Sequence, residues 1–408
     1  MDFNWRDSIY RNCRFNNCHH WHIHEIIMSE WKEYKLGEIA SFVTEKVAVH
    51  SIATEKYIST ENMLPDKGGI TVASGKPEEG TITKYYPNTT LISNIRPYFK
   101  KIWYATKEGG CSNDVLCFKA MDGVVESKYL FFLLSQDMFF DYVMLGSKGC
   151  KMPRGDKAHI MNWDISLPPL DEQRHIASIL TSLDDKIDLL RRENATLEAM
   201  AETLFRQWFV VEAKEEWEEG KVIDLTKHVK DSINPQKYPN TVFQHYSIPA
   251  YDDGKKPTIE TGENIQSNKY VIPQKSILFS KLNPHKDKRV WLMLDDVPDN
   301  AVCSTEFQIV KPNNSEYLYF MYGWLTFKDN YEEIASGVGG TSGSHQRIDP
   351  KSIFAFACPK VDMETIRNYN KKVEPLFYKQ RNNQLQIQTL IQTRDGLLPR
   401  LMNNNIIV

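Results

Sequence analysis

The sequence predicts an α+β protein in which two globular units of similar pattern are each followed by one long amphipathic helix, and the two helices pair. Three observations carry this prediction. The chain has 408 residues, more than one hydrophobic core usually organises. Short apolar and aromatic motifs recur in the same order in its two halves, and a heptad stripe closes each half.

Five short motifs of the first half are matched, in order, by motifs of the second half. The matched pairs are 31–40 with 217–226, 90–97 with 275–284, 102–104 with 290–292, 111–118 with 303–310, and 128–134 with 316–322. Any one pair of apolar runs could match by chance. Five pairs in one order favour an internal duplication.

The first long helix is expected over residues 171–212. Asp171, after Leu167-Pro-Pro-Leu170, suits the N-cap, and Glu172 suits the first turn, where the helix dipole favours an acid. A mainly apolar stripe then follows in alternating steps of four and three, the spacing of a coiled-coil seam. These residues are Ile176, Leu180, Leu183, Ile187, Leu190, Asn194, Leu197, Ala201, Leu204 and Trp208.

The second long helix is expected within residues 362–408, with Pro399 as its end. Its stripe is more polar and comprises Val373, Leu376, Gln380, Asn383, Ile387, Leu390, Arg394 and Leu397. Asn194 and Asn383 both fall in the seam, where one polar residue can fix the register. The residues expected to pair the helices are Leu183, Ile187, Leu190, Asn194, Leu197, Leu376, Asn383, Ile387 and Leu390.

An alternative is that each helix packs only on its own globular unit. Length argues against this, because a helix of roughly 35 residues spans about 50 Å, more than a small domain needs to cover. The helices are therefore interpreted as spacers.

Composition limits the classes of function. A formal net charge of -3 does not by itself indicate nucleic-acid binding, so such binding would need a local basic surface. The seven cysteines contain no CxxC pair, which favours free thiols in a reducing compartment. No apolar run is long enough to cross a bilayer, so a cytoplasmic protein without a membrane partner is expected.

Residues 1–27 differ from the rest and are interpreted as an N-terminal extension, expected to be disordered. They contain residues of metal-binding type, but the spacing matches no standard closed site, so no metal is assigned. These residues are Cys13, Cys18, His19, His20, His22 and His24.

Catalytic motifs are missing. Leu167-Pro-Pro-Leu170 lacks the polar and aromatic ends of the motif used by amino-methyltransferases, and no glycine-rich cofactor loop is seen. Gly69 and Gly75-Lys76 do not have the spacing of a phosphate-binding loop. Pro65-Asp66-Lys67 has no convincing acidic partner for a nuclease site. No catalytic residue and no cofactor are assigned.

Basic, amide and hydroxyl side chains gather in loops at equivalent points of the two halves. Such loops can approach phosphates and donate to base edges, although any single residue could equally be a solvated surface group. The candidate DNA-binding residues are Asn94, Arg96, Lys100, Lys101, Lys148, Lys151, Arg154 and Lys157 in the first half, and Lys281, Asn283, His285, Lys286, Arg289, Ser342, Ser344, His345, Gln346 and Arg347 in the second.

From Met28 onward the chain resembles the specificity subunits of type I restriction-modification systems. The motifs that carry the resemblance are Leu167-Pro-Pro-Leu-Asp-Glu-Gln-Arg-His-Ile176, Leu183-Asp-Asp-Lys-Ile-Asp-Leu-Leu190, Tyr57-Ile-Ser-Thr-Glu-Asn62, His245-Tyr-Ser-Ile-Pro-Ala-Tyr-Asp252, Ile277-Leu-Phe-Ser-Lys-Leu-Asn-Pro284, Ser304-Thr-Glu-Phe307 and Leu397-Leu-Pro-Arg-Leu401.

The resemblance implies two target-recognition domains, at 28–170 and 213–361, separated by two long antiparallel coiled-coil helices in a pseudo-twofold repeat. Each domain would bind one half of a bipartite double-stranded DNA site. The partners would be two methyltransferase (modification) subunits, which use S-adenosylmethionine, and restriction/translocase subunits, which cleave DNA. Spacers of about 50 Å imply half-sites on the order of 15 base pairs apart.

Two other functions remain open at this point. A stand-alone DNA methyltransferase or nuclease with an atypical site would modify or cut DNA without partners. A helical scaffold for proteins alone would show no sequence-dependent DNA binding.

Overall fold

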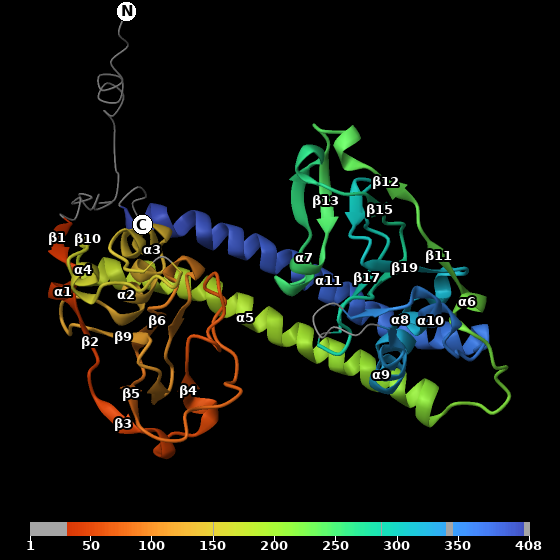
Figure 1. The fold of residues 1–408 in the computed structure, drawn as a ribbon, viewed down its shortest axis with the longest axis horizontal. Coiled ribbons are helices and arrows are strands. Elements are labelled where there is room, and N and C mark those ends of the chain that lie inside the picture. The colour runs from red at the N-terminus through yellow and green to blue at the C-terminus, as the bar shows by residue number, and fades with distance from the viewer. Residues whose placement is uncertain (1–30, 150, 287, 340–345, 404–408) are drawn as a thin grey trace, which may run out of the picture. The chain divides into compact units, whose positions relative to one another are not determined.

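The computed structural model describes residues 31–149, 151–286, 288–339 and 346–403 (Figure 1). The prediction of an N-terminal extension over 1–27 lies outside these residues. The chain divides into two compact units. Unit 1 combines Met1–Asp185 with Ile391–Val408, and unit 2 comprises Lys186–Leu390. The predicted domain boundaries stay a prediction.

Unit 1 contains two four-stranded sheets. The first has the order β2-β9-β6-β7 and is antiparallel throughout, and the second has the order β3-β5-β8-β4, in which β4 runs parallel to β8. A separate ladder joins β1 and β10. The strands are β1 (Lys32–Lys35), β2 (Ala40–Phe42), β3 (Lys46–Ala48), β4 (Tyr57–Ile58), β5 (Thr81–Tyr85), β6 (Thr89–Ser93), β7 (Ile102–Tyr104), β8 (Gly109–Cys111), β9 (Val115–Ala120) and β10 (Asp164–Leu167).

Two helices of unit 1, α2 and α4, begin at side-chain caps. Glu126 accepts a hydrogen bond from the backbone N–H of Tyr129 at the start of α2, and Asp156 accepts from Ala158 and His159 at the start of α4. The aromatic run of α2 buries Tyr129 and Phe132 in the core of the unit. The helices are α1 (Leu36–Ile39), α2 (Ser127–Leu134), α3 (Asp137–Leu145) and α4 (Lys157–Met161).

Unit 2 is built on the same plan. Its first sheet has the order β11-β19-β16-β17, and its second has the order β12-β15-β18-β13-β14, in which β13 runs parallel to β18. The strands are β11 (Thr226–Val229), β12 (Ser232–Ile233), β13 (Val242–Tyr246), β14 (Thr258–Thr261), β15 (Lys269–Val271), β16 (Ser276–Ser280), β17 (Val290–Met293), β18 (Ala301–Cys303), β19 (Phe307–Pro312), β20 (Val338–Gly339) and β21 (Arg347–Ile348).

Two helices of unit 2, α7 and α10, likewise begin at side-chain caps. Ser247 caps α7 and Asp349 caps α10, and Phe320 of α8 is fully buried. The helices are α6 (Val222–Leu225), α7 (Ile248–Asp252), α8 (Leu318–Thr326), α9 (Lys328–Ser336) and α10 (Pro350–Ala355).

The two main sheets of unit 1 correspond in strand order to the two main sheets of unit 2. The order β2-β9-β6-β7 matches β11-β19-β16-β17, and β3-β5-β8-β4 matches β12-β15-β18-β13, each with one parallel pair at the same place. Unit 2 adds β14 at the edge of its second sheet. The fold is therefore of the mixed α/β kind that the sequence predicts for both globular parts.

Two long helices, α5 (Leu170–Arg206) and α11 (Met363–Met402), contribute to both units (Figure 1). Within unit 1, Ile176 and Leu180 of α5 share a core with Leu398 and Leu401 of α11. Within unit 2, Phe205 of α5 shares a core with residues from the first turns of α11. Two contacts within unit 2 give the direction of the helices, because Phe205 contacts Tyr369 and Asn194, earlier in α5, bonds to Asn383, later in α11. The two helices therefore run antiparallel in unit 2.

Two predicted helix limits are wrong. Asp171 lies inside the first turn of α5, because the helix begins at Leu170 and the carbonyl of Pro169 already accepts from the N–H of Gln173. Pro399 does not end α11, which continues to Met402. Burial of Leu401 and Met402 in the core of unit 1 offsets the backbone hydrogen bond that a proline removes. Within the described residues, no helix is long and apolar enough to span a membrane.

Candidate nucleic-acid interface

In unit 1, the loop that leaves β6 is bonded to the start of β9 and to a second loop before α4. The N–H of Asn94 donates to the carbonyl of Asp114 at 2.8 Å, and the N–H of Arg96 donates to the carbonyl of Pro153 at 2.8 Å. Ile95 forms an isolated bridge with Arg154. Because β6 and β9 are antiparallel neighbours, the end of one necessarily meets the start of the other.

In unit 2, the equivalent loop leaves β16 and makes the same bonds. The N–H of Lys281 donates to the carbonyl of Glu306 at 3.0 Å, and the N–H of Asn283 donates to the carbonyl of Gln346 at 2.8 Å. Leu282 forms the bridge with Arg347. Arg96 and Asn283 also share a left-handed backbone, with φ of 49° and 47°. The predicted DNA-binding loops are thus assembled in the same way in both units.

Two basic residues of the second loop of unit 1 are held by carboxylates. Nη2 of Arg154 lies 3.1 Å from Oδ1 of Asp114. Nζ of Lys148 lies 2.7 Å from Oδ2 of Asp156, and this contact, helped by two backbone N–H donors, lowers the pKa of Asp156 to about 2. Lys151 and Lys157 are exposed. Two of these four cations are thus paired with carboxylates, and the other two are exposed to solvent.

The cations of the first loop of unit 1 are tied more closely to the protein. Nζ of Lys100 lies 3.1 Å from Asp137, which also binds Lys67. Nζ of Lys101 donates to the carbonyl of Thr60 at 2.7 Å, and partial burial lowers its pKa. Both lysines are half-buried, so they brace the loop.

In unit 2, Arg347 makes a bidentate ion pair with Glu306. Nε lies 3.0 Å from Oε2 and Nη2 lies 3.0 Å from Oε1, and the carboxylate raises the pKa of Arg347. His285 and Lys286 are exposed on the neighbouring loop. The predicted residues Ser342, Ser344 and His345 lie outside the described residues.

Arg289 differs from the other candidates. Its side chain is only 10% exposed and forms a bidentate pair with Asp252, with Nε 2.6 Å from Oδ1 and Nη2 2.9 Å from Oδ2. Because its guanidinium is engaged inside the unit, its position fits a structural role. The sequence around Arg289 is rich in lysine and arginine and does not reveal that its partner, Asp252, lies 37 residues earlier in the chain.

Sequence reasoning missed the acids Asp114 and Glu306 as members of the loop cluster. Both follow a buried cysteine and a serine at the same point of the repeat, Cys111-Ser-Asn-Asp114 and Cys303-Ser-Thr-Glu306. The shared position of an acid was the available signal. Without this signal, the sequence offers only basic and neutral residues as candidates for the loop cluster.

The predicted helix-pairing residues lie along facing sides of α5 and α11. Ile187, Leu190 and Ile387 are 2%, 1% and 5% exposed, and Asn383 is 1% exposed. Nδ2 of Asn383 donates to Oδ1 of Asn194 at 3.0 Å and to Oε2 of Glu193 at 2.9 Å. The remaining predicted residues are half-buried, namely Leu183, Leu197, Leu376 and Leu390.

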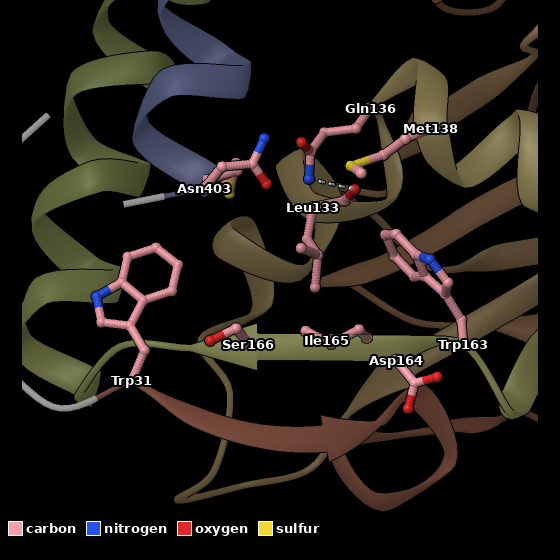
Figure 2. A pocket seen from close by; sticks show the side chains of 10 residues that line it. Trp31, Leu133, Gln136, Met138, Trp163, Asp164, Ile165, Ser166 and Asn403 are labelled. Atoms are coloured by element: carbon pink, nitrogen blue, oxygen red, sulfur yellow. Dashed lines mark hydrogen bonds between the residues drawn. The ribbon is translucent and has the colours of Figure 1, made fainter. Parts of the chain in front are cut away.

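A cavity of about 260 Å³ in unit 1 lies elsewhere. Figure 2 shows Trp31 and Trp163 on opposite sides of it, with strand β10 below and the amides of Gln136 and Asn403 above. None of the predicted DNA-binding residues lines this cavity. Among the described residues, no group of three or more His, Cys, Asp or Glu side chains is placed to hold a metal.

Comparison with known proteins gives concordant matches. Residues 28–199 match the family model described as the type I restriction modification DNA specificity domain. The chain is 27% identical over 313 residues to the type I restriction enzyme MjaIX specificity subunit of Methanocaldococcus jannaschii, covering 69% of each chain. It is 23% identical to the HindI specificity subunit of Haemophilus influenzae, over 93% of this chain and 100% of the relative.

A solved structure shares the fold. The crystal structure of the type I restriction-modification system S subunit from M. genitalium matches with a TM-score of 0.60 at 16% identity, covering 92% of this chain and 96% of that one.

Proposed function

This chain belongs to the specificity subunits of type I restriction-modification systems, and from that premise we propose that it recognises a bipartite double-stranded DNA site, one half-site for each globular unit. As a specificity subunit it is the non-catalytic, DNA-recognising member of the system. The target-recognition domains are proposed at 28–170 and 213–361. The two domains are expected to bind different half-sites, because the side chains of their loops differ.

One observation supports the proposed interface above the others. In both units the loop after a central strand, β6 or β16, is bonded to a second basic loop through equivalent backbone groups. The second loop brings Arg154 or Arg347 to the same place. Because arginine can donate two hydrogen bonds to a base edge, these loops are suited to direct base recognition.

The partners are proposed to be two methyltransferase subunits and the restriction/translocase subunits. The methyltransferase subunits would dock on α5 and α11 and supply the S-adenosylmethionine chemistry. Their cationic surfaces would add to the DNA clamp, in agreement with a net charge of -3 on this chain. The system is expected in the cytoplasm, where the DNA is.

The long helices are proposed to set the gap between half-sites. At 1.5 Å per residue, the 37 residues of α5 span about 55 Å. At 3.4 Å per base pair this length corresponds to roughly 16 base pairs. The half-site centres should therefore lie near one and a half turns apart.

The decisive experiment is single-molecule methylation sequencing of the host genome with this gene intact and deleted. A split methylated motif that disappears on deletion supports the proposal. Purified chain that methylates or cuts DNA alone would favour a stand-alone enzyme instead. A complex that assembles but shows no sequence-dependent DNA binding would favour a protein scaffold.

A further inference from the structure

The two units contain one ion pair at the same structural position. In unit 1 it joins Asp114, just before β9, to Arg154; in unit 2 it joins Glu306, just before β19, to Arg347. We propose that these carboxylates are positioning residues that aim each arginine at a guanine, one in each half-site. This inference rests on the proposed function and assigns a specificity role to two acids.

The equivalence of the two pairs is set by the backbone. In each unit the acid's carbonyl accepts from the first residue after the central strand, and the arginine bridges the next residue. The acid and the arginine are therefore fixed to opposite sides of one short loop. A chance surface contact has no reason to recur in both units with the same bonds.

The geometry in unit 2 leaves the recognition end of the guanidinium open. Glu306 engages Nε and one hydrogen of Nη2 of Arg347. A guanidinium has five N–H donors, so among the described residues both hydrogens of Nη1 and the second hydrogen of Nη2 remain without a hydrogen-bond partner. These donors form the end-on fork that matches O6 and N7 of guanine in the major groove.

Exposure supports the direction in which each pair points. The side chains of Arg154 and Arg347 are 56% and 45% exposed, whereas those of Asp114 and Glu306 are 37% and 25% exposed. The acid is the more buried partner in each pair, so the arginine projects outward. An arginine held in one orientation loses less conformational entropy when it binds a base.

Another ion pair of unit 2 shows what a structural pair looks like. Arg289 with Asp252 is also bidentate, but there the arginine is the buried member, at 10% exposure against 46% for the acid. Such a pair cannot present its guanidinium outward. The two loop pairs have the reverse arrangement, which suits contact with DNA.

The pairs are unequal in strength. Arg347 makes close bonds to both oxygens of Glu306, whereas Arg154 makes one contact, from Nη2 to Oδ1 of Asp114. Loss of the acid should therefore affect the half-site of unit 2 more than that of unit 1. Replacing the acid by its amide also removes a negative charge that repels DNA phosphates. Non-specific DNA binding should therefore rise while selectivity for the base falls.

The test is methylation sequencing in a host that expresses the whole complex, with the wild-type chain or with E306Q, D114N, R347K or E218Q. E306Q should keep the cognate motif methylated but raise methylation at sites with a wrong base at one position by on the order of tenfold. D114N should do the same, more weakly, at one position of the other half-site. R347K, which keeps the charge without the fork, should relax the same position as E306Q.

E218Q is the matched control. Glu218 pairs with Lys360 at 3.3 Å in unit 2 and is not part of the loops that hold the arginines, so its loss should leave the motif unchanged. The half-site that each variant leaves intact reports that the chain is folded.

Two failures are distinguishable. A wild-type complex without a split methylated motif would remove the proposed function itself. A wild-type motif that E306Q and D114N leave unchanged, or weaken equally at every position, would overturn the positioning role while leaving the proposed function intact.

Discussion

Nδ2 of Asn383 in α11 donates a hydrogen bond to Oδ1 of Asn194 in α5, 3.0 Å away, within the helix pair of unit 2. Asn383 is 1% exposed, so neither water nor a shifted partner can easily replace this bond. Gln380 adds a bond to the carbonyl of Asn194 at 2.9 Å. The seam thus contains a polar layer whose hydrogen bonds favour this register.

Replacing one asparagine should cost more than replacing both. N194L removes a hydrogen-bond partner of the buried Asn383 amide and should lower the free energy of unfolding by about 1–3 kcal/mol. The double variant N194L/N383L should recover much of that loss, because leucine packs in a coiled-coil seam. Denaturant unfolding of the four chains in a double-mutant cycle measures the coupling, and simple additivity of the two substitutions would contradict the bond's importance.

A second polar contact braces the helix pair within unit 1. Nη1 of Arg394 lies 2.9 Å from Oδ1 of Asp184, and the two side chains are 21% and 30% exposed. R394A should destabilise the chain by about 2 kcal/mol, because it leaves a carboxylate partly buried without its cation. R367A is the control, since Arg367 is 61% exposed in its pair with Glu316 and should cost well under 1 kcal/mol. If R394A and R367A lower the melting temperature equally, burial of the ion pair does not determine its contribution to stability.

Arg289 and Lys286, three residues apart, should respond in opposite ways. R289A should lower the free energy of unfolding by about 2 kcal/mol, because it removes a buried side chain together with its packing and its bidentate ion pair. K286A should leave unfolding unchanged and weaken DNA binding by the assembled complex alike for all sequences, as loss of a phosphate contact does. An unchanged melting temperature for R289A would contradict the structural role and favour a DNA contact for Arg289.

Asp362 should make the stability of α11 depend on pH. Its carboxylate caps the helix by accepting from the N–H of Thr365 at 2.8 Å, and that bond, with contacts from Trp217 and Lys214, holds its pKa well below the ordinary value. Because the folded pKa is depressed, the stabilisation is present above the unfolded pKa of about 3.9 and is lost as the pH falls toward the folded value. D362A should cost about 1 kcal/mol at pH 7.

D362N is the companion variant, because it keeps an acceptor for Thr365 without a titrating group. The difference in unfolding free energy between wild type and D362N should shrink as the pH falls below about 4. A difference that stays constant from pH 7 to pH 3 would exclude the charge of Asp362 as the cause.

A longer helix pair should widen the gap in the DNA site. One heptad inserted between residues 186 and 201 of α5, with one inserted between residues 376 and 390 of α11, adds about 10 Å to the pair. The non-specific gap should then lengthen by about three base pairs in methylation sequencing. The same seven residues placed in the exposed turn at Gly123 should leave the gap as it was. An unchanged gap in the lengthened chain would end the spacer proposal.

The long helices were the most predictable part of the fold, because a heptad repeat fixes which side of a helix is apolar. Their ends were not predictable. Gln173 ties the start of α5 to the globular part by donating to the carbonyl of Pro168 at 2.8 Å and accepting from the N–H of Glu126 at 2.9 Å. Met402 extends the end of α11 past Pro399 because it is buried. Both limits depend on contacts distant in sequence.

The loops were predictable as basic clusters but not as assemblies. The sequence positions of Asn94, Arg96 and Arg154 do not predict the backbone bridge that joins their two loops. Nor does the sequence separate Arg347, which projects outward, from Arg289, which is buried. A charged side chain can occupy either position, and its nearest carboxylate in space decides which.

Unit 1 draws its core from two segments that are far apart in the sequence, since Leu398, Leu401 and Met402 pack with Ile176 and Leu180. During synthesis the first globular part therefore emerges from the ribosome long before its last core residues exist. The apolar side of α5 in unit 1 therefore stays uncovered until unit 2 and the end of α11 have been translated. The core of unit 1 is thus completed late in folding. A chain that lacks the last few turns of α11 would leave the core of unit 1, the part translated first, incomplete.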